Sequence, residues 1–287
     1  MLDYHLHLWP HGDHAHTPTL DQLADYCEHA ATHGVTEIAL TEHLFRFRQA
    51  DVLAGFWADD PNPILRHAMA EFWHDEMEAD LDQYVETVLA AKAAGLPVVL
   101  GLEVDHYRGA MDRVATLLDG YPFDVLLGSV HWIGAWGFDN LGDPVQIAEW
   151  DARGIENVWG EYTDCLEELA ASGVCDVLAH PDLPKLSGKV PQTPDEFYDR
   201  MAEAAARWSM AAEVSSGGFR KPVNEAYPAP ALLGRFHARG VPITTASDAH
   251  RVSEVASRGD ELRVLLRTAG YDSLTAYRSR VSRQVPV

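Results

Sequence analysis

Seven short apolar runs recur along the chain, and each leads into a polar or histidine-bearing segment. Each run is rich in Val, Ile and Leu and has the length of a strand buried on both faces, as in a parallel sheet. The runs cover residues 2–8, 35–40, 97–104, 123–130, 175–179, 211–215 and 241–246. This pattern predicts seven buried strands spread over the whole length of the chain.

Amphipathic stretches of helical length lie between these runs, at residues 19–33, 69–94, 158–172, 194–207 and 229–239. Glycine follows four of them, at positions 34, 95, 173 and 240, where a helix that turns into a strand commonly ends. The alternation of strand and helix predicts parallel βα units. Seven such units within 287 residues favour a closed (βα)7 barrel of TIM-barrel type over an open sheet with two domains.

We therefore expect a single α/β domain over residues 1–287. Residues 45–80 depart from the strand–helix pattern and carry several large aromatic side chains, among them Phe56, Trp57 and Trp73. We interpret them as an insertion of loop and helix after the second strand. On the upper face of a barrel, such loops often cover or narrow the active site.

The charge balance is acidic, with 44 Asp and Glu against 22 Lys and Arg. Such a surface repels phosphate backbones and anionic lipids, which argues against nucleic acid or a membrane as the partner. The three cysteines are scattered without a CxxC pair, and the first ten residues lack the apolar segment of a secretory signal. We expect a cytoplasmic protein that acts on a small molecule.

The chemistry is concentrated where the predicted strands end. His5 and His7 form an HxH pair, and side chains two positions apart on a strand point to the same face. Asp248 and His250 repeat this spacing after the last strand. Further metal-ligand types follow other strands: His43, Glu103, His131 and His180. In a barrel the carboxyl ends of all strands meet at one rim, which is where active sites lie.

One histidine at a strand end is more often structural than functional. Metal-ligand residues at six strand ends together indicate a functional site. Imidazoles and carboxylates that converge without partners are costly to bury, and metal ions are the usual compensation. Nitrogen and oxygen donors without cysteine suit Zn, Mn or Fe(II). Seven or eight ligands exceed what one ion binds, so we expect two to three divalent metal ions.

The motifs, taken in order, resemble those of the polymerase and histidinol phosphatase (PHP) superfamily, and most of all its monofunctional histidinol-phosphate phosphatase branch. The segments that carry the resemblance are His5–His7, Thr41–His43, Gly101–Glu103, Ser129–His131, Ala179–Asp182, Gly217–Pro222 and Ser247–His250. The resemblance covers nearly the whole chain. It implies the PHP fold, a distorted (βα)7 barrel.

The resemblance also implies how three metal ions are shared. The first ion takes His5, His7, Glu103 and Asp248, and the second takes Glu103, His131 and His180. The third takes His43, His250 and a histidine of the loop after the first strand. In this chain that loop departs from the family spacing, and His11, His14 and His16 are the candidates for the ligand. His11 keeps the Pro-His-Gly context, and His14 is the alternative.

Roles beyond metal binding follow from the same resemblance. Asp248, Glu103 and His250 are the expected catalytic residues, and Arg220 is the expected phosphate ligand, because a guanidinium matches phosphate oxygens in bidentate fashion. Apart from the resemblance, Asp105 and His106 follow Glu103 and have two interpretations: they supply a proton to the leaving alkoxide, or they orient a ligand through a hydrogen bond.

The implied activity is hydrolysis of the phosphomonoester L-histidinol phosphate to L-histidinol and phosphate, a step of histidine biosynthesis, by a metal-bridging hydroxide. The ligands alone do not fix the substrate. A PHP-type phosphatase for another small phosphomonoester and a non-catalytic metal-binding module remain as alternatives. The acidic charge argues against a proofreading nuclease.

Overall fold

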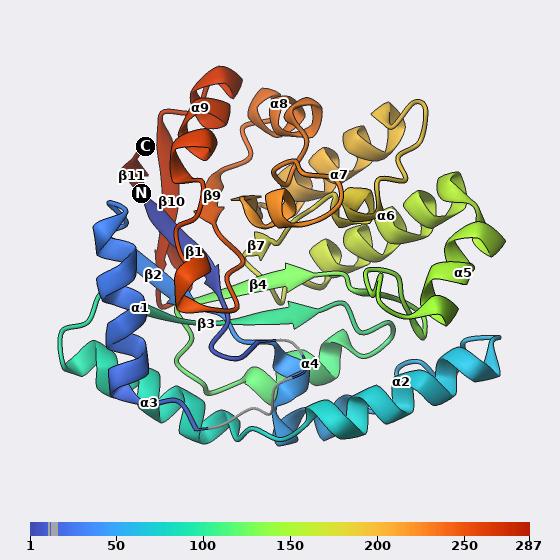
Figure 1. The fold of residues 1–287 in the computed structure, drawn as a ribbon, viewed down its shortest axis with the longest axis horizontal. Helices are drawn as coiled ribbons and strands as arrows, with labels where there is room; N and C mark the ends of the chain where they lie inside the picture. The colour runs from blue at the N-terminus through green and yellow to red at the C-terminus, as the bar shows by residue number, and fades with distance from the viewer. Residues whose placement is uncertain (11, 13–16) are drawn as a thin grey trace.

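The computed structural model describes residues 1–10, 12 and 17–287 of the protein, which form a barrel of parallel strands inside a ring of helices (Figure 1). Neighbouring strands in the seven-stranded sheet are all parallel. In spatial order the strands are β1 (Leu2–Leu6), β2 (Glu37–Leu40), β3 (Val98–Asp105), β4 (Val125–Ser129), β7 (Val177–Leu178), β8 (Ala211–Ser215) and β9 (Ile243–Ala246). The predicted α/β fold, a distorted (βα)7 barrel, is confirmed.

The barrel is nearly closed, because its last strand lies beside its first. The backbone N–H of His7 donates to the carbonyl oxygen of Ala249 at 2.8 Å. The buried carboxylate of Asp3 accepts from the backbone N–H and the hydroxyl of Ser247, both at 2.7 Å. These contacts join segments that are more than 240 positions apart in the sequence and bring the first and last predicted ligand pairs together.

The helices pack outside the strands, as Figure 1 shows. They are α1 (Leu20–Thr32), α2 (Pro63–Glu76), α3 (Leu81–Ala93), α4 (Met111–Leu118), α5 (Pro144–Arg153), α6 (Ile155–Ser172), α7 (Asp195–Arg207), α8 (Pro230–Ala238) and α9 (Gly259–Ala269). Short 3₁₀ helices include η1 (Leu44–Arg46), η2 (Arg48–Leu53), η3 (Leu183–Ser187), η4 (Gly217–Arg220) and η5 (Val252–Glu254). Apolar side chains fill the strand–helix layer and the barrel interior as two buried clusters.

One predicted helix, over residues 69–94, is interrupted in the structure. It divides into α2, which ends at Glu76, and α3, which begins at Leu81. The Asp80 carboxylate accepts from the backbone N–H groups of Asp82 and Gln83 and so caps the start of a new helix. The amphipathic pattern continues through this point and therefore predicted one helix. Ala79, within this break, forms a β-bridge with Phe47, which joins the two ends of the 45–80 segment.

Two small antiparallel hairpins lie outside the predicted pattern. One pairs β5 (Trp132–Ile133) with β6 (Trp136–Gly137), just after the fourth barrel strand. The other pairs β10 (Ser273–Arg278) with β11 (Val281–Pro286) and lies near both chain termini in Figure 1. The Asp124 carboxylate, directly before β4, accepts from the backbone N–H of Ser279 in the hairpin turn. The C-terminal hairpin therefore lies at the amino-terminal end of the strands, away from the rim that carries the histidines.

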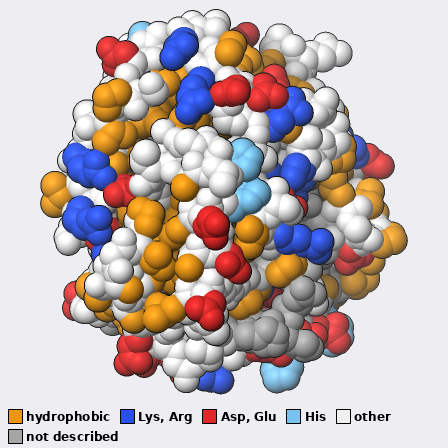
Figure 2. Space-filling model, turned by 60° about the vertical axis from the view of Figure 1, so that its left-hand side comes forward, with side chains coloured by type: hydrophobic (Ala, Val, Ile, Leu, Met, Phe, Trp, Pro, Cys, Tyr) orange, Lys and Arg blue, Asp and Glu red, His pale blue; other side chains and the backbone are white. Residues whose placement is uncertain are grey.

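On the face drawn in Figure 2, basic and acidic side chains are interspersed, and Lys and Arg do not gather into one patch. The three cysteines are buried and free of disulfide bonds. Among the described residues, no helix is both long enough and apolar enough to cross a membrane.

Candidate metal centre

The two histidines of the HxH pair project from the end of β1 into the same buried site. His5 Nε2 lies 3.2 Å from Glu103 Oε2 on β3, and His7 Nε2 lies 3.5 Å from the same oxygen. His7 Nε2 is also 3.6 Å from Asp248 Oδ1, beyond the end of β9. The alternation of side chains along β1 therefore places both imidazoles on the side predicted from the sequence.

Glu103 stands at the middle of the cluster. Its Oε2 lies 2.8 Å from His43 Nδ1, and its Oε1 lies 3.0 Å from His180 Nε2 and 3.6 Å from His131 Nε2. Burial disfavours the charged carboxylate, but His5, His43 and His131 outweigh it and hold the pKa of Glu103 well below its usual range. One ionised carboxylate therefore faces imidazoles from several strands.

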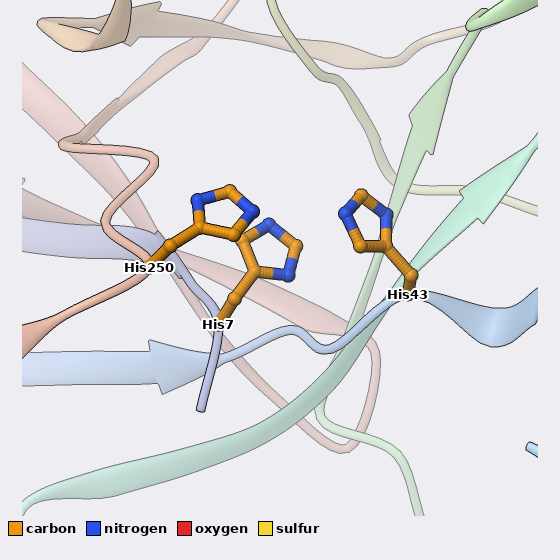
Figure 3. Close-up of side chains that lie close together, drawn as sticks. All are labelled: His7, His43 and His250. Carbon is orange, nitrogen blue, oxygen red and sulfur yellow. The ribbon is translucent and has the colours of Figure 1, made fainter. Parts of the chain in front are cut away.

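A second concentration of imidazoles lies beside it. His7, His43 and His250 come from the ends of β1, β2 and β9 and point toward a common space (Figure 3). The ring of His7 stacks at 4.2 Å between centroids on His43 and at 4.2 Å on His250. Burial and the neighbouring His250 and His43 lower the pKa of His7 well below its usual value, so its imidazole is favoured in the neutral form that binds metal.

The structure thus brings together all the predicted ligands that it describes. Their nitrogen and oxygen atoms form four groups of three, each with its atoms within 4.8 Å of one another. The groups are His5, Glu103 and His180; His5, His7 and Asp248; His43, Glu103 and His131; and His7, His43 and His250. The predicted loop ligands His11 and His14, and the further candidate His16, lie outside the described residues.

The donor set fits divalent transition-metal ions. Within the described part of the chain, His5 Nε2, His7 Nε2 and Glu103 Oε2 are buried and make no hydrogen bond. Leaving such groups unsatisfied is costly, and a cation among them removes that cost. Imidazole nitrogens and carboxylate oxygens without thiolates suit Zn, Mn or Fe.

Carboxylates behind the histidines orient the rings, and two of them were not predicted as site residues. Glu213 Oε2 lies 2.7 Å from His5 Nδ1, and Glu42 Oε1 lies 3.3 Å from His7 Nδ1. Each bond leaves the Nε2 atom directed at the site. The sequence did carry a signal for each of these two carboxylates. Glu213 is a charged residue within the predicted buried strand Ala211–Ser215, and Glu42 lies in the motif Thr41–His43.

Asp105 plays the same part for His131, with Asp105 Oδ1 2.6 Å from His131 Nδ1. Burial opposes the charged imidazole, but Asp105 and Glu103 raise the pKa of His131 to about 10. Asp105 is completely buried and does not line the cavity, and its Oδ1 is held by His131, so the geometry favours the orienting interpretation of Asp105 over proton donation to a substrate.

Two of the predicted site residues have backbone conformations that are rare outside glycine. His180 has φ 27° and Asp248 has φ 53°. Non-glycine residues with positive φ are strained, and such strain concentrates at functional sites. Arg220 supports this turn: its Nη2 donates to the carbonyl oxygens of Ser247 at 2.9 Å and Asp248 at 2.5 Å. In this state the guanidinium holds the Asp248 backbone.

Two other rim cations lie in internal ion pairs. Lys185 is buried and donates to Glu225 Oε2 at 2.8 Å, and it lies 3.0 Å from Asp182 Oδ2. Arg46 is buried 3.6 Å from both Glu42 and Glu76. These contacts give both side chains structural roles.

A cavity of about 460 Å³ opens above the histidine cluster. Its floor carries six predicted ligands, which are His43, Glu103, His131, His180, Asp248 and His250. Its walls include Phe45, Met69 and Phe72 from the 45–80 segment, and Trp132 of β5 packs against Phe45 and Phe72. A cavity of this size matches a small-molecule substrate.

A parallel barrel with histidines and carboxylates gathered at the carboxyl ends of its strands defines a metal-dependent enzyme class. The model of the PHP domain family matches residues 3–217, so the chain belongs to the PHP domain family. The chain is 33% identical over 279 residues to the "Probable histidinol-phosphatase" of Deinococcus radiodurans, with 96% of each chain covered.

Solved structures share the fold. The histidinol phosphate phosphatase of Lactococcus lactis, solved with zinc, L-histidinol and phosphate, superposes with a TM-score of 0.70 at 20% identity over 98% of both chains. The hisK protein of Listeria monocytogenes superposes with a TM-score of 0.72 at 18% identity, over 91% of this chain and 99% of the other. The predicted resemblance to the histidinol phosphatase branch is confirmed.

Proposed function

We propose that this protein hydrolyses L-histidinol phosphate to L-histidinol and phosphate with the help of divalent metal ions, as a step of histidine biosynthesis. The observation that carries the proposal is the cluster of six imidazoles with Glu103 and Asp248, of which four imidazoles and both carboxylates line one cavity. It occurs in a chain that is 33% identical to a probable histidinol-phosphatase along almost its whole length. This makes the protein a phosphoric monoester hydrolase.

Two or three metal ions fit the four donor groups, with Glu103 shared between them. His5, His7 and Asp248 would hold one ion with Glu103, and His131 and His180 a second. His43 and His250 would hold a third, together with His7 or a histidine of the loop after β1. When bound, the ions neutralise phosphoryl oxygens and acidify water for attack on phosphorus.

The protein's own residues position the reaction. Glu213, Glu42 and Asp105 fix three histidines in the tautomer that directs a nitrogen at the site. Arg220 holds the Asp248 turn by donating to the Asp248 carbonyl oxygen, and its phosphate-binding role is part of the proposal because a guanidinium pairs with phosphate oxygens. Lys221 lines the cavity beside Asp248 and adds a second positive group for the substrate's anionic end.

The decisive experiment measures phosphate release from a panel of phosphomonoesters, with metals quantified on the same preparation. We expect histidinol phosphate to lead in kcat/KM by about 100-fold, a gap of about 2.7 kcal/mol. Asp248→Asn should lose turnover while the protein stays folded. Preference for a different ester would keep the assignment as a phosphatase and overturn the assignment of the substrate. No phosphate release from a metal-loaded protein would favour a non-catalytic metal-binding module.

A further inference from the structure

The wall of the cavity formed by the β5–β6 hairpin and the start of α5 carries acceptor groups that metal binding does not use. Asp139 follows β6 in the connection to α5 and lines the cavity half-buried. Gln146, in the first turns of α5, is buried and lines the same cavity. Both lie outside the four donor groups assigned to metal ions.

Most polar groups near this wall already have partners. Asp143 Oδ1 accepts from the backbone N–H of Val145 and caps α5, and Asn140 Oδ1 accepts from Gly142. Across the cavity, Glu76 lies 3.6 Å from Arg46 Nε. Asp139 differs, because within the described part of the chain no side chain or backbone N–H bonds its carboxylate. Gln146 Oε1 is likewise buried without a hydrogen-bond partner there.

An anionic acceptor and a buried amide oxygen left open in one cavity call for a ligand that donates hydrogen bonds and carries positive charge. The apolar side chains Phe45, Phe72 and Trp132 line the same cavity and lower its polarity around such a pairing. An ammonium–carboxylate contact is stronger at such a partly buried wall than in bulk water. The wall is therefore unsuited to a second phosphate or a carboxylate.

The charges of the cavity also orient a substrate. Lys221 and the proposed metal ions make one side of the cavity positive, near Asp248, and this side favours a phosphate dianion. An ammonium group is repelled from that side and attracted to the Asp139 wall. We propose that Asp139, assisted by Gln146, binds the primary ammonium of an amino-alcohol phosphate and so selects cationic phosphomonoesters over neutral ones. This deepens the proposed function and rests on it.

The test uses a matched pair of substrates with the metal-loaded, full-length protein: histidinol phosphate and its deaminated analogue, 3-(imidazol-4-yl)propyl phosphate. We expect the wild type to prefer the amine in kcat/KM by about 10- to 100-fold, the range of a charged hydrogen bond. Asp139→Asn should remove most of this preference, through a fall in kcat/KM for histidinol phosphate larger than any change for the analogue. Asp139→Glu should restore part of it.

The control is Asp25→Asn, which makes the same change of charge on the exposed face of α1 and should keep the wild-type preference. An Asp139→Asn protein with normal metal content and the full wild-type preference would overturn the inference. If neither substrate of the pair is hydrolysed but other esters are, the histidinol phosphate assignment fails. The ammonium inference is then tested by the kcat/KM ratio of O-phosphoethanolamine to ethyl phosphate in the same variants. Loss of a preference for the amine in Asp139→Asn supports the inference, and an unchanged ratio overturns it.

Discussion

His5 Nδ1 lies 2.7 Å from Glu213 Oε2, and both side chains are completely buried. Burial disfavours a charged imidazole, but Glu213 and Glu103 on its two sides raise the pKa of His5 well above its usual value. The Glu213 bond fixes the ring so that Nε2 points at Glu103 and the proposed metal ions. Glu213, on the far side of the ring, thus sets the direction of His5, a proposed metal ligand.

We predict that Glu213→Ala lowers metal affinity or activity by about 10- to 100-fold, as loss of the partner behind a ligating histidine does. Glu213→Gln should lose less, because its amide oxygen still accepts from Nδ1. Metal titration and kcat/KM on the same samples measure the effect. Glu196→Gln, an exposed change on α7, is the control. Wild-type metal affinity and activity in Glu213→Ala would contradict the positioning role.

Asp105 either orients His131 or donates a proton to the leaving group, and a mutation distinguishes these roles because leaving groups differ in their need for a proton. A nitrophenolate leaves without protonation, whereas an alkoxide requires it. If Asp105 only orients His131 through its 2.6 Å bond, Asp105→Asn should reduce kcat/KM for p-nitrophenyl phosphate and for an alkyl phosphate by similar factors. A loss confined to the alkyl ester would instead identify Asp105 as the proton donor.

Gly217 marks a close approach to the Asp248 side chain. A Cβ at position 217 would lie 2.8 Å from Asp248 Oδ2 and 3.0 Å from Asp248 Cβ, so Gly217→Ala must displace this carboxylate. We expect activity to fall by about 100-fold, as it does when a reacting group shifts by about 1 Å. Gly234→Ala on α8 has open space around its new methyl group and should retain activity. Measuring kcat/KM together with the circular dichroism spectrum distinguishes displacement of the Asp248 carboxylate from unfolding of the protein.

Asp124 joins three parts of the barrel's amino-terminal end. Its carboxylate pairs with Lys92 of α3 and accepts from the backbone N–H groups of Leu100 and Ser279, both at 3.0 Å. Burial opposes ionisation, but these partners lower the pKa of Asp124 below its usual value. We expect Asp124→Asn to lower the free energy of unfolding by about 1–3 kcal/mol at neutral pH.

The sign of the pH dependence follows from that lowered pKa. A carboxylate whose folded-state pKa lies below its unfolded value of about 3.9 stabilises the protein fully above that value. The stabilisation is lost as the pH falls through the folded-state pKa. Urea unfolding should therefore show a constant wild-type-to-variant difference between about pH 5 and 8 that shrinks below about pH 4. Asp119→Asn, an exposed change, should show no such difference.

Much of the fold and site could be predicted because the signals are local. Apolar runs of strand length mark all seven barrel strands, and the spacing of His5 and His7 sets both on one face. Parallel strands bring their carboxyl ends to one rim whatever the connections are, which is why ligands from β1, β2, β3, β4, β7 and β9 could be grouped from the sequence. The family motifs added the ligand sets.

Only the tertiary structure decided which groups meet across the barrel. His5 and Glu213 are 208 positions apart, and nothing in their local sequence pairs them. Arg220 follows β8 and reaches the Ser247 and Asp248 carbonyls beyond the neighbouring strand β9, which a motif cannot show. Ala79, in the break between α2 and α3, bridges to Phe47, more than 30 positions away. The sequence itself determined the strands, the faces and the rim, because backbone periodicity is local. Partners, tautomers and cavity walls come from contacts that exist only once the barrel has closed.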